Sequence, residues 1–136
     1  MSAVGLAPEV PVLVLAPSER APALARRFIA ERFRELEIAD DYVGRLVVTE
    51  LVTNACQHVG IGFIVVRIVP GHDGRVLVEV WDEGTELPVL KAGDAEATSG
   101  RGLMLMAELV DDWGVRPLNE PGKIVWASCA LGKARS

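Results

Sequence analysis

The chain has little cysteine, no excess of positive charge and no long apolar run. Each of these absences argues against a class of protein to which the chain could belong. Its two cysteines, Cys56 and Cys129, lie far apart in the sequence, without the close spacing of a zinc site or a redox pair. We expect both to be ordinary buried thiols. The formal net charge of −5 argues against direct binding of nucleic acid, because affinity for phosphate backbones comes from clustered lysine and arginine.

The apolar run nearest the N-terminus, residues 10–16, follows an acidic residue and is too short for a secretory signal or a membrane span. We therefore expect a cytoplasmic protein that does not bind a membrane. Half of the 136 residues are hydrophobic, which predicts a real core and not disorder. The length fits one domain, which we expect at residues 8–132, with flexible termini at 1–7 and 133–136.

Hydrophobic periodicity predicts the order of helices and strands. Residues 10–15 read as a strand at a sheet edge, because Pro11 cannot donate to a ladder. A helix follows Pro17 and Ser18, and a second begins near Asp41 and ends near His58. Residues 63–69 and 75–82 form the arms of a predicted β-hairpin, and a helix at 103–110 precedes strands at 113–116 and 123–131.

This order predicts an α+β fold, a two-layer sandwich with helices on one face of a mixed, mainly antiparallel sheet. The strict βαβ alternation of a dinucleotide-binding fold is absent, and so is its glycine fingerprint after a first strand.

The second predicted helix carries polar residues on its apolar side. Glu50 and Asn54 lie about 40° apart around a helix, in the same stripe as Val43 and Val47. Burying a carboxylate and an amide among aliphatic side chains costs about a few kcal/mol per group unless each has a partner. The pattern therefore predicts a bound group on this side of the helix, and a metal ion or a nucleotide would serve.

Two further segments offer groups that suit a nucleotide. Asp82, on the apolar face of its strand, can accept a hydrogen bond from a base amine, while Gly84 lets a flat ring approach the backbone. Gly100 and Gly102 open a predicted helix, and free N–H groups at a helix start suit phosphates. An amide oxygen beside them can complete the coordination of Mg²⁺.

From the residues alone, plainer interpretations stay open. Glu50 could form a salt bridge with an arginine of the first helix, and Asn54 could bond to backbone. Asp82 could begin a tight turn, and Gly100 and Gly102 could simply start a helix.

Taken in order, these motifs resemble those of a known superfamily, the GHKL ATPases. Glu50-Leu-Val-Thr-Asn-Ala55 resembles their N box. Asp82-Glu-Gly84 followed by Pro88 resembles the G1 box, and Gly100-Arg-Gly-Leu103 the G2 box. The chain is most similar to the anti-sigma-factor serine/threonine kinases, in particular to short actinobacterial regulators with a motif like Gly122-Lys-Ile-Val-Trp126.

The resemblance implies a histidine-kinase-like ATPase fold, also called the Bergerat fold, that binds ATP and Mg²⁺. It makes Glu50 the general base, Asn54 the Mg²⁺ ligand and Asp82 the carboxylate that recognises adenine, with Gly84 against the base. Residues 89–99 would be the ATP lid.

The resemblance also implies a phosphate site at the start of the last helix. Gly100 and Gly102 would line the triphosphate, and Arg101 could add a charge-assisted contact. Pro88 and Leu103 complete the implied nucleotide-binding set. The implied activity is phosphorylation of a STAS-type anti-sigma antagonist, with binding of a sigma factor as a second role, and related kinases often act as homodimers.

Two positions depart from the family pattern. Glu86 stands where the G1 box usually has a second glycine, which brings a negative charge toward the nucleotide. Ile124 is matched to the threonine that usually joins the adenine-binding network through water. These departures favour the alternative that the chain is a non-catalytic nucleotide-binding or interaction module with a degenerate G1 box.

Overall fold

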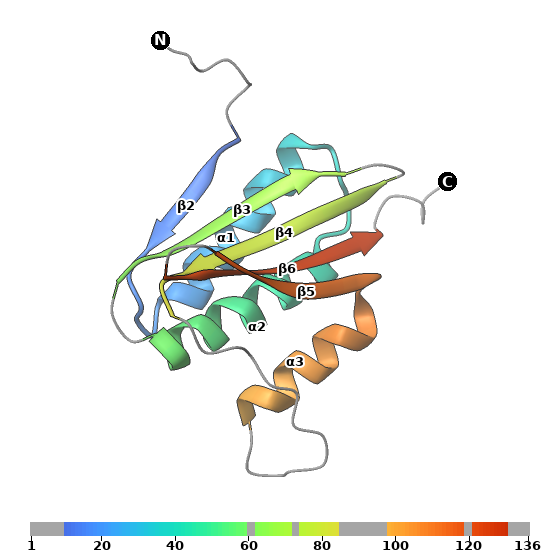
Figure 1. The fold of residues 1–136 in the computed structure, drawn as a ribbon. Coiled ribbons are helices and arrows are strands. Elements are labelled where there is room, and N and C mark those ends of the chain that lie inside the picture. The colour runs from blue at the N-terminus through green and yellow to red at the C-terminus, as the bar shows by residue number, and fades with distance from the viewer. Residues whose placement is uncertain (1–9, 60–61, 72–73, 85–97, 119–120, 131–136) are drawn as a thin grey trace.

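The computed structural model describes residues 10–59, 62–71, 74–84, 98–118 and 121–130, with side chains except at 58–59 and 98–103. The helices and strands within these residues follow one another along the chain as shown in Figure 1. They are β2 (Val12–Leu15), α1 (Ala21–Glu35), α2 (Tyr42–Val59), β3 (Ile64–Pro70), β4 (Arg75–Asp82), α3 (Thr98–Leu109), β5 (Asp112–Pro117) and β6 (Lys123–Ala130).

The strands form one five-stranded sheet in the order β2-β3-β4-β6-β5. All four described strand pairs are antiparallel, so the parallel contribution implied by a mixed sheet is not present among them. The helices form the second layer, with α1 against β2 and β3, and α2 beneath β3, β4 and β6 (Figure 1). The predicted α+β two-layer architecture is confirmed.

Period-two alternation decides which side chains of the hairpin face the helices. In β4 the side chains predicted to share the inward face, Val76, Val78, Val80 and Asp82, are all buried. The opposite face of the sheet carries no helix in Figure 1, and Trp81 on that face is half-buried. The inward face therefore ends in a carboxylate on its last residue.

Several boundaries differ from the sequence prediction, among them those of the last helix and of β5. The last helix begins at Thr98, so Gly100 and Gly102 lie inside its first turns instead of preceding it. The strand β5 begins at Asp112 and ends at Pro117, one residue longer at each end than predicted. Among the described residues, no helix is long and apolar enough to cross a membrane.

The cysteines behave differently from each other. Cys129 is buried at 1% exposure, and burial, with Asp111 nearby, raises the pKa of its thiol to about 12. A thiol that stays protonated is a poor nucleophile, as expected of an ordinary core cysteine. Cys56 is only partly buried, so the prediction of two buried thiols is right for Cys129 alone.

The position of α2 depends on a close approach to α1 at Gly44. A Cβ at this glycine would lie 2.6 Å from Cζ of Phe33, which is itself buried at 1% exposure. Any larger residue would push the ring of Phe33 or separate the two helices. Since α2 carries Glu50 and Asn54, this contact sets where the polar side of α2 lies relative to the sheet.

We expect Gly44→Ala to lower the free energy of unfolding by about 1–3 kcal/mol through overpacking against Phe33. In an unobstructed helix the same change stabilises by about 0.5–1 kcal/mol, so the sign is diagnostic. Urea unfolding measures it. In a Phe33→Leu background the loss from Gly44→Ala should shrink, and a stabilising Gly44→Ala would contradict the close approach.

Candidate functional site

Asp82, the last residue of β4, lies at the centre of the candidate site. Its side chain is 1% exposed. Its Oδ1 accepts two hydrogen bonds, one from Nζ of Lys123 and one from the backbone N–H of Gly84, and each donor–acceptor distance is 2.8 Å. Its Oδ2 has no hydrogen-bond partner among the described residues. One oxygen of the carboxylate is thus held by the protein, and the other has no partner among the residues that the structure describes.

Lys123 is a residue that the sequence reasoning did not assign to the site. It is directly opposite Asp82 in the β4–β6 ladder and 1% exposed, and it forms a buried ion pair with that carboxylate. Residues directly opposed in an antiparallel pair place their side chains on the same face. The register of β6 on β4 is therefore the signal that could have identified Lys123. This register is a pairing of two distant segments, so the sequence of either segment alone does not reveal it.

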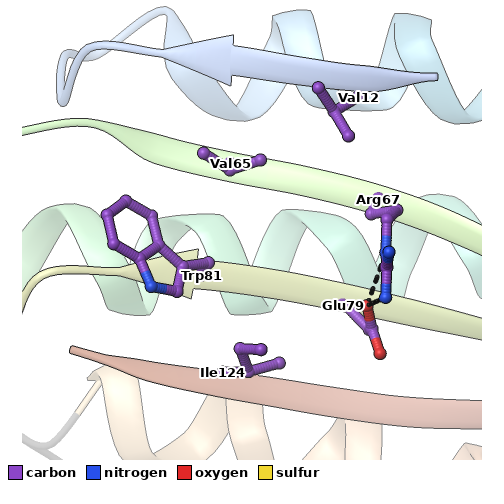
Figure 2. Close-up of a pocket in the computed structure, with 6 residues that line it drawn as sticks. All are labelled: Val12, Val65, Arg67, Glu79, Trp81 and Ile124. Carbon is purple, nitrogen blue, oxygen red and sulfur yellow. Dashed lines mark hydrogen bonds and ion pairs between the residues drawn. The ribbon is translucent and has the colours of Figure 1, made fainter. Parts of the chain in front are cut away.

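Ile124, the position matched to the threonine of the family's adenine network, lies on the other face of the sheet from Asp82. Figure 2 shows Ile124 with Val65 and Trp81 on the open face of the sheet, where they line a shallow pocket. Successive residues of a strand point to opposite faces, so Ile124 cannot share the helix side with Asp82. The residue of β6 that faces Asp82 is Lys123.

Asn54 on α2 is buried at 3% exposure. Its Oδ1 has no hydrogen-bond partner among the described residues. A buried amide oxygen without a partner costs about 1–3 kcal/mol. This oxygen would suit a hard cation or a ligand donor, while a bond of the Asn54 amide nitrogen to backbone stays open.

Glu50 lies one turn before Asn54 on α2 and is half-buried. Burial raises the pKa of its carboxyl above the usual 4.5. Within the described residues it forms no ion pair: on α1, Arg26 donates to Thr49 and Arg32 pairs with Glu35. A carboxylate that is partly desolvated and unpaired is a better proton acceptor than an exposed one.

The remaining predicted residues are only partly accessible to description. Gly100, Arg101, Gly102 and Leu103 lie in the first turns of α3, which packs against α2, and nothing is described of their side chains. Pro88 and Glu86 lie outside the described residues, as do residues 89–97 of the predicted lid. Their roles stay predictions.

The elements that carry these residues meet on one side of the molecule. In Figure 1 the end of β4 and the start of β6 lie above the C-terminal half of α2, and α2 contacts α3. Gly122, just before β6, has a φ of 132°, and a Cβ there would lie 3.0 Å from the backbone oxygen of Asp82. Glycine is thus required where β6 closes on β4.

We expect Lys123→Met and Asp82→Asn each to lower the free energy of unfolding by about 3–5 kcal/mol, because each leaves one buried group without its charged partner. The double variant should lose clearly less than the sum of the two. Urea unfolding of the four proteins closes the cycle. Ile124→Thr, on the other face of the same strand, is the matched control that should not couple to Asp82, and additive losses within about 0.5 kcal/mol for the Lys123 pair would contradict the interaction.

The raised pKa of Glu50 makes stability depend on pH with a definite sign. As pH rises above 4.5, the unfolded chain loses the Glu50 proton before the folded protein does, so stability falls until the folded pKa is passed. Glu50→Gln removes this loss. We expect its advantage over the wild type to grow with pH and then level off, measured by urea unfolding between about pH 4 and 8. The exposed Glu31→Gln on α1 is the control, and an equal advantage for both variants would refute the prediction.

Comparison with known proteins places the chain in a family. The model of the histidine kinase-like ATPase domain matches residues 15–129. Among solved structures, the RsbU and RsbW domains of Rv1364c from Mycobacterium tuberculosis match with a TM-score of 0.62 and 23% identity over 92% of this chain.

The chain spans 33% of the length of that solved protein, so the likeness concerns the fold of one part of it. No match was found among curated proteins. The family model covers most of the chain, including both α2 and the β4–β6 pair. The chain therefore belongs to the histidine kinase-like ATPase domain family, and it is an ATP-binding type of domain of the GHKL superfamily.

Proposed function

We propose that the chain is a cytoplasmic, Mg-ATP-dependent protein serine/threonine kinase of the anti-sigma-factor type. The observation that carries the proposal is a pair of buried oxygens, Asp82 Oδ2 and Asn54 Oδ1, that have no hydrogen-bond partner among the described residues. They lie on β4 and α2, two elements that are in contact. Buried polar atoms are normally hydrogen-bonded, so a ligand that bonds to these two oxygens would satisfy them.

Adenine recognition falls to Asp82 in this proposal. Its Oδ2 would accept a hydrogen bond from the exocyclic amine of the base, while Oδ1 is held by Lys123 and Gly84. Because the carboxylate is fixed from one side, its free oxygen is preorganised for that donor. Gly84 would lie against the ring.

The phosphates would lie between α2 and the start of α3. Asn54 would hold Mg²⁺ through Oδ1, and the ion would supply neutralisation of phosphate charge. Among the described residues, no group of three or more histidine, cysteine or acidic side chains could hold a metal, and Mg²⁺ commonly shares its coordination between one or two protein ligands and substrate phosphates. Gly100, Arg101 and Gly102 would contact the triphosphate, with Leu103 and Pro88 completing the pocket.

Glu50 would act as general base. Its carboxylate accepts the proton of a serine hydroxyl, the hydroxyl oxygen forms a bond to the γ-phosphorus, and the bond between that phosphorus and the β–γ bridging oxygen breaks to release ADP. The raised pKa of Glu50 suits this role, since a carboxyl of ordinary pKa is a weak base near neutral pH.

The protein partner in this proposal is a STAS-type anti-sigma antagonist that receives the phosphate, or a sigma factor bound according to nucleotide state. The structural likeness to a protein with an RsbW domain supports a partner of this class. A homodimer remains a prediction from family resemblance.

One observation favours a second candidate, a nucleotide-binding or interaction module that transfers no phosphate. Lys123 occupies one oxygen of the carboxylate that should recognise adenine, so Asp82 has a structural role that needs no ligand. Glu86 adds a negative charge to the same motif.

We expect Mg-ATP at about 100 times its Kd to stabilise the wild type by roughly 2.7 kcal/mol, which raises Tm by several degrees. Asp82→Asn, compared with its own ligand-free Tm, should lose the shift because the amide places a donor against the base amine. Glu50→Ala should keep the shift and lose phosphate transfer to a STAS protein, measured with radiolabelled ATP.

Ile124→Thr serves as the control and should bind and transfer as the wild type does. An unchanged Tm of the wild type with Mg-ATP would remove nucleotide binding altogether. A normal shift with no transfer to a cognate STAS protein would leave the interaction module as the function.

A further inference from the structure

The buried pair at the junction of β4 and β6 holds a hydrogen-bond donor and an acceptor that no described residue uses. The ammonium of Lys123 has three N–H donors, and one acceptor, Asp82 Oδ1 at 2.8 Å, is found for it among the described residues. The other carboxylate oxygen, Asp82 Oδ2, has none. Both side chains are 1% exposed, so bulk water does not reach them.

The backbone fixes the direction of both groups. Asp82 and Lys123 are directly opposed in the ladder, and their side chains share the face covered by α2. Gly122, with its φ of 132°, brings the start of β6 against the end of β4. Lys123 therefore cannot extend to solvent as lysines at strand ends usually do, and its charge lies beside the carboxylate.

We propose that Lys123 is a specificity-determining residue that recognises the nucleobase together with Asp82. Its ammonium donates a hydrogen bond to the ring nitrogen N1 of adenine, while Asp82 Oδ2 accepts one from the amine at position 6. This inference rests on the proposed function, since it assumes that the base lies against Asp82.

The chemistry of the base edge matches the unused groups of the pair. Adenine presents a donor at position 6 next to an acceptor at position 1, and the protein presents an acceptor next to a donor. Guanine and hypoxanthine present the reverse order, a carbonyl at position 6 and an N–H at position 1. A ring in the same orientation would then set a carbonyl against a carboxylate and an N–H against an ammonium, so the pair favours adenine.

The proposal also explains why a cation is tolerated at this depth. A buried ammonium with a single acceptor is costly, because most of its hydration is lost without replacement. A ring nitrogen at N1 supplies a second acceptor when nucleotide is bound. The same lysine serves the fold through Oδ1 of Asp82 and the ligand through its remaining donors.

The test compares ATP with 1-deaza-ATP, which keeps the amine at position 6 and has carbon in place of N1. Binding to the wild type is measured by calorimetry with Mg²⁺ present. Loss of a hydrogen bond to a charged donor should weaken 1-deaza-ATP by about 10-fold to 100-fold relative to ATP. In Lys123→Met the ratio of the two affinities should fall to within about 3-fold, and in the control Ile124→Met it should stay as in the wild type.

A structural role of Lys123 alone would weaken both nucleotides equally in Lys123→Met and keep their ratio, which would overturn the inference. If ATP binds the wild type and 1-deaza-ATP binds equally well, the inference fails while the proposed function stands. If ATP itself does not bind, both fail.

Should Lys123→Met not fold, the wild type labelled with ¹⁵N at the lysine side chains keeps the test open. The chain has three lysines, at positions 91, 123 and 133. The ammonium resonance of Lys123 should move on saturation with Mg-ATP and move less than half as far with 1-deaza-ATP. Equal movement with the two nucleotides overturns the assignment of Lys123 to N1.

Discussion

The buried ion pair between Asp82 and Lys123 is the interaction on which the candidate site depends. It joins the end of β4 to the start of β6 on the side that α2 covers. Removing two charges from water costs several kcal/mol per ion, and the pair is sparsely hydrogen-bonded among the described residues. It is therefore better explained by the geometry that it holds than by any gain in stability: one carboxylate oxygen is fixed, and the other meets no hydrogen-bond donor from the described part of the chain.

The second constraint is the close packing of α2 against α1. Gly44 allows α1 to lie close to α2, and Val47 and Leu51 fill the core on the side facing the strands. Further along the same helix, Asn54 is fully buried and Glu50 only half-buried. One helix thus offers two environments one turn apart: a buried position for the amide of Asn54, and a partly solvated one for the carboxylate of Glu50, as the proposed roles of a metal ligand and a general base would require.

Periodicity predicted the α+β architecture, the hairpin and the inward direction of Asn54 and Asp82, because one buried face per element is enough to specify these. It failed where two strands must be aligned. Ile124 was matched to a threonine of the family pattern, but the ladder register places Lys123 on the inward face. Glu79, on the open face by alternation, is nevertheless buried at 6% exposure under Arg67 and Arg116, which reach it from other strands. Pairings between distant segments leave no trace in a local pattern.

The two unsatisfied oxygens are not equal as indicators of a ligand. Asp82 accepts a hydrogen bond from Lys123 through Oδ1, so a buried carboxylate at this position can be explained in part without a nucleotide. Asn54 has no such explanation for its Oδ1, since a valine or leucine there would fill the same volume without the cost of an unpaired oxygen. A module that only used the fold for protein contacts would keep the Asp82–Lys123 pair and gain from losing Asn54. The amide at this buried position is therefore the stronger of the two indicators of a bound ligand, and it agrees with the proposed Mg-ATP site.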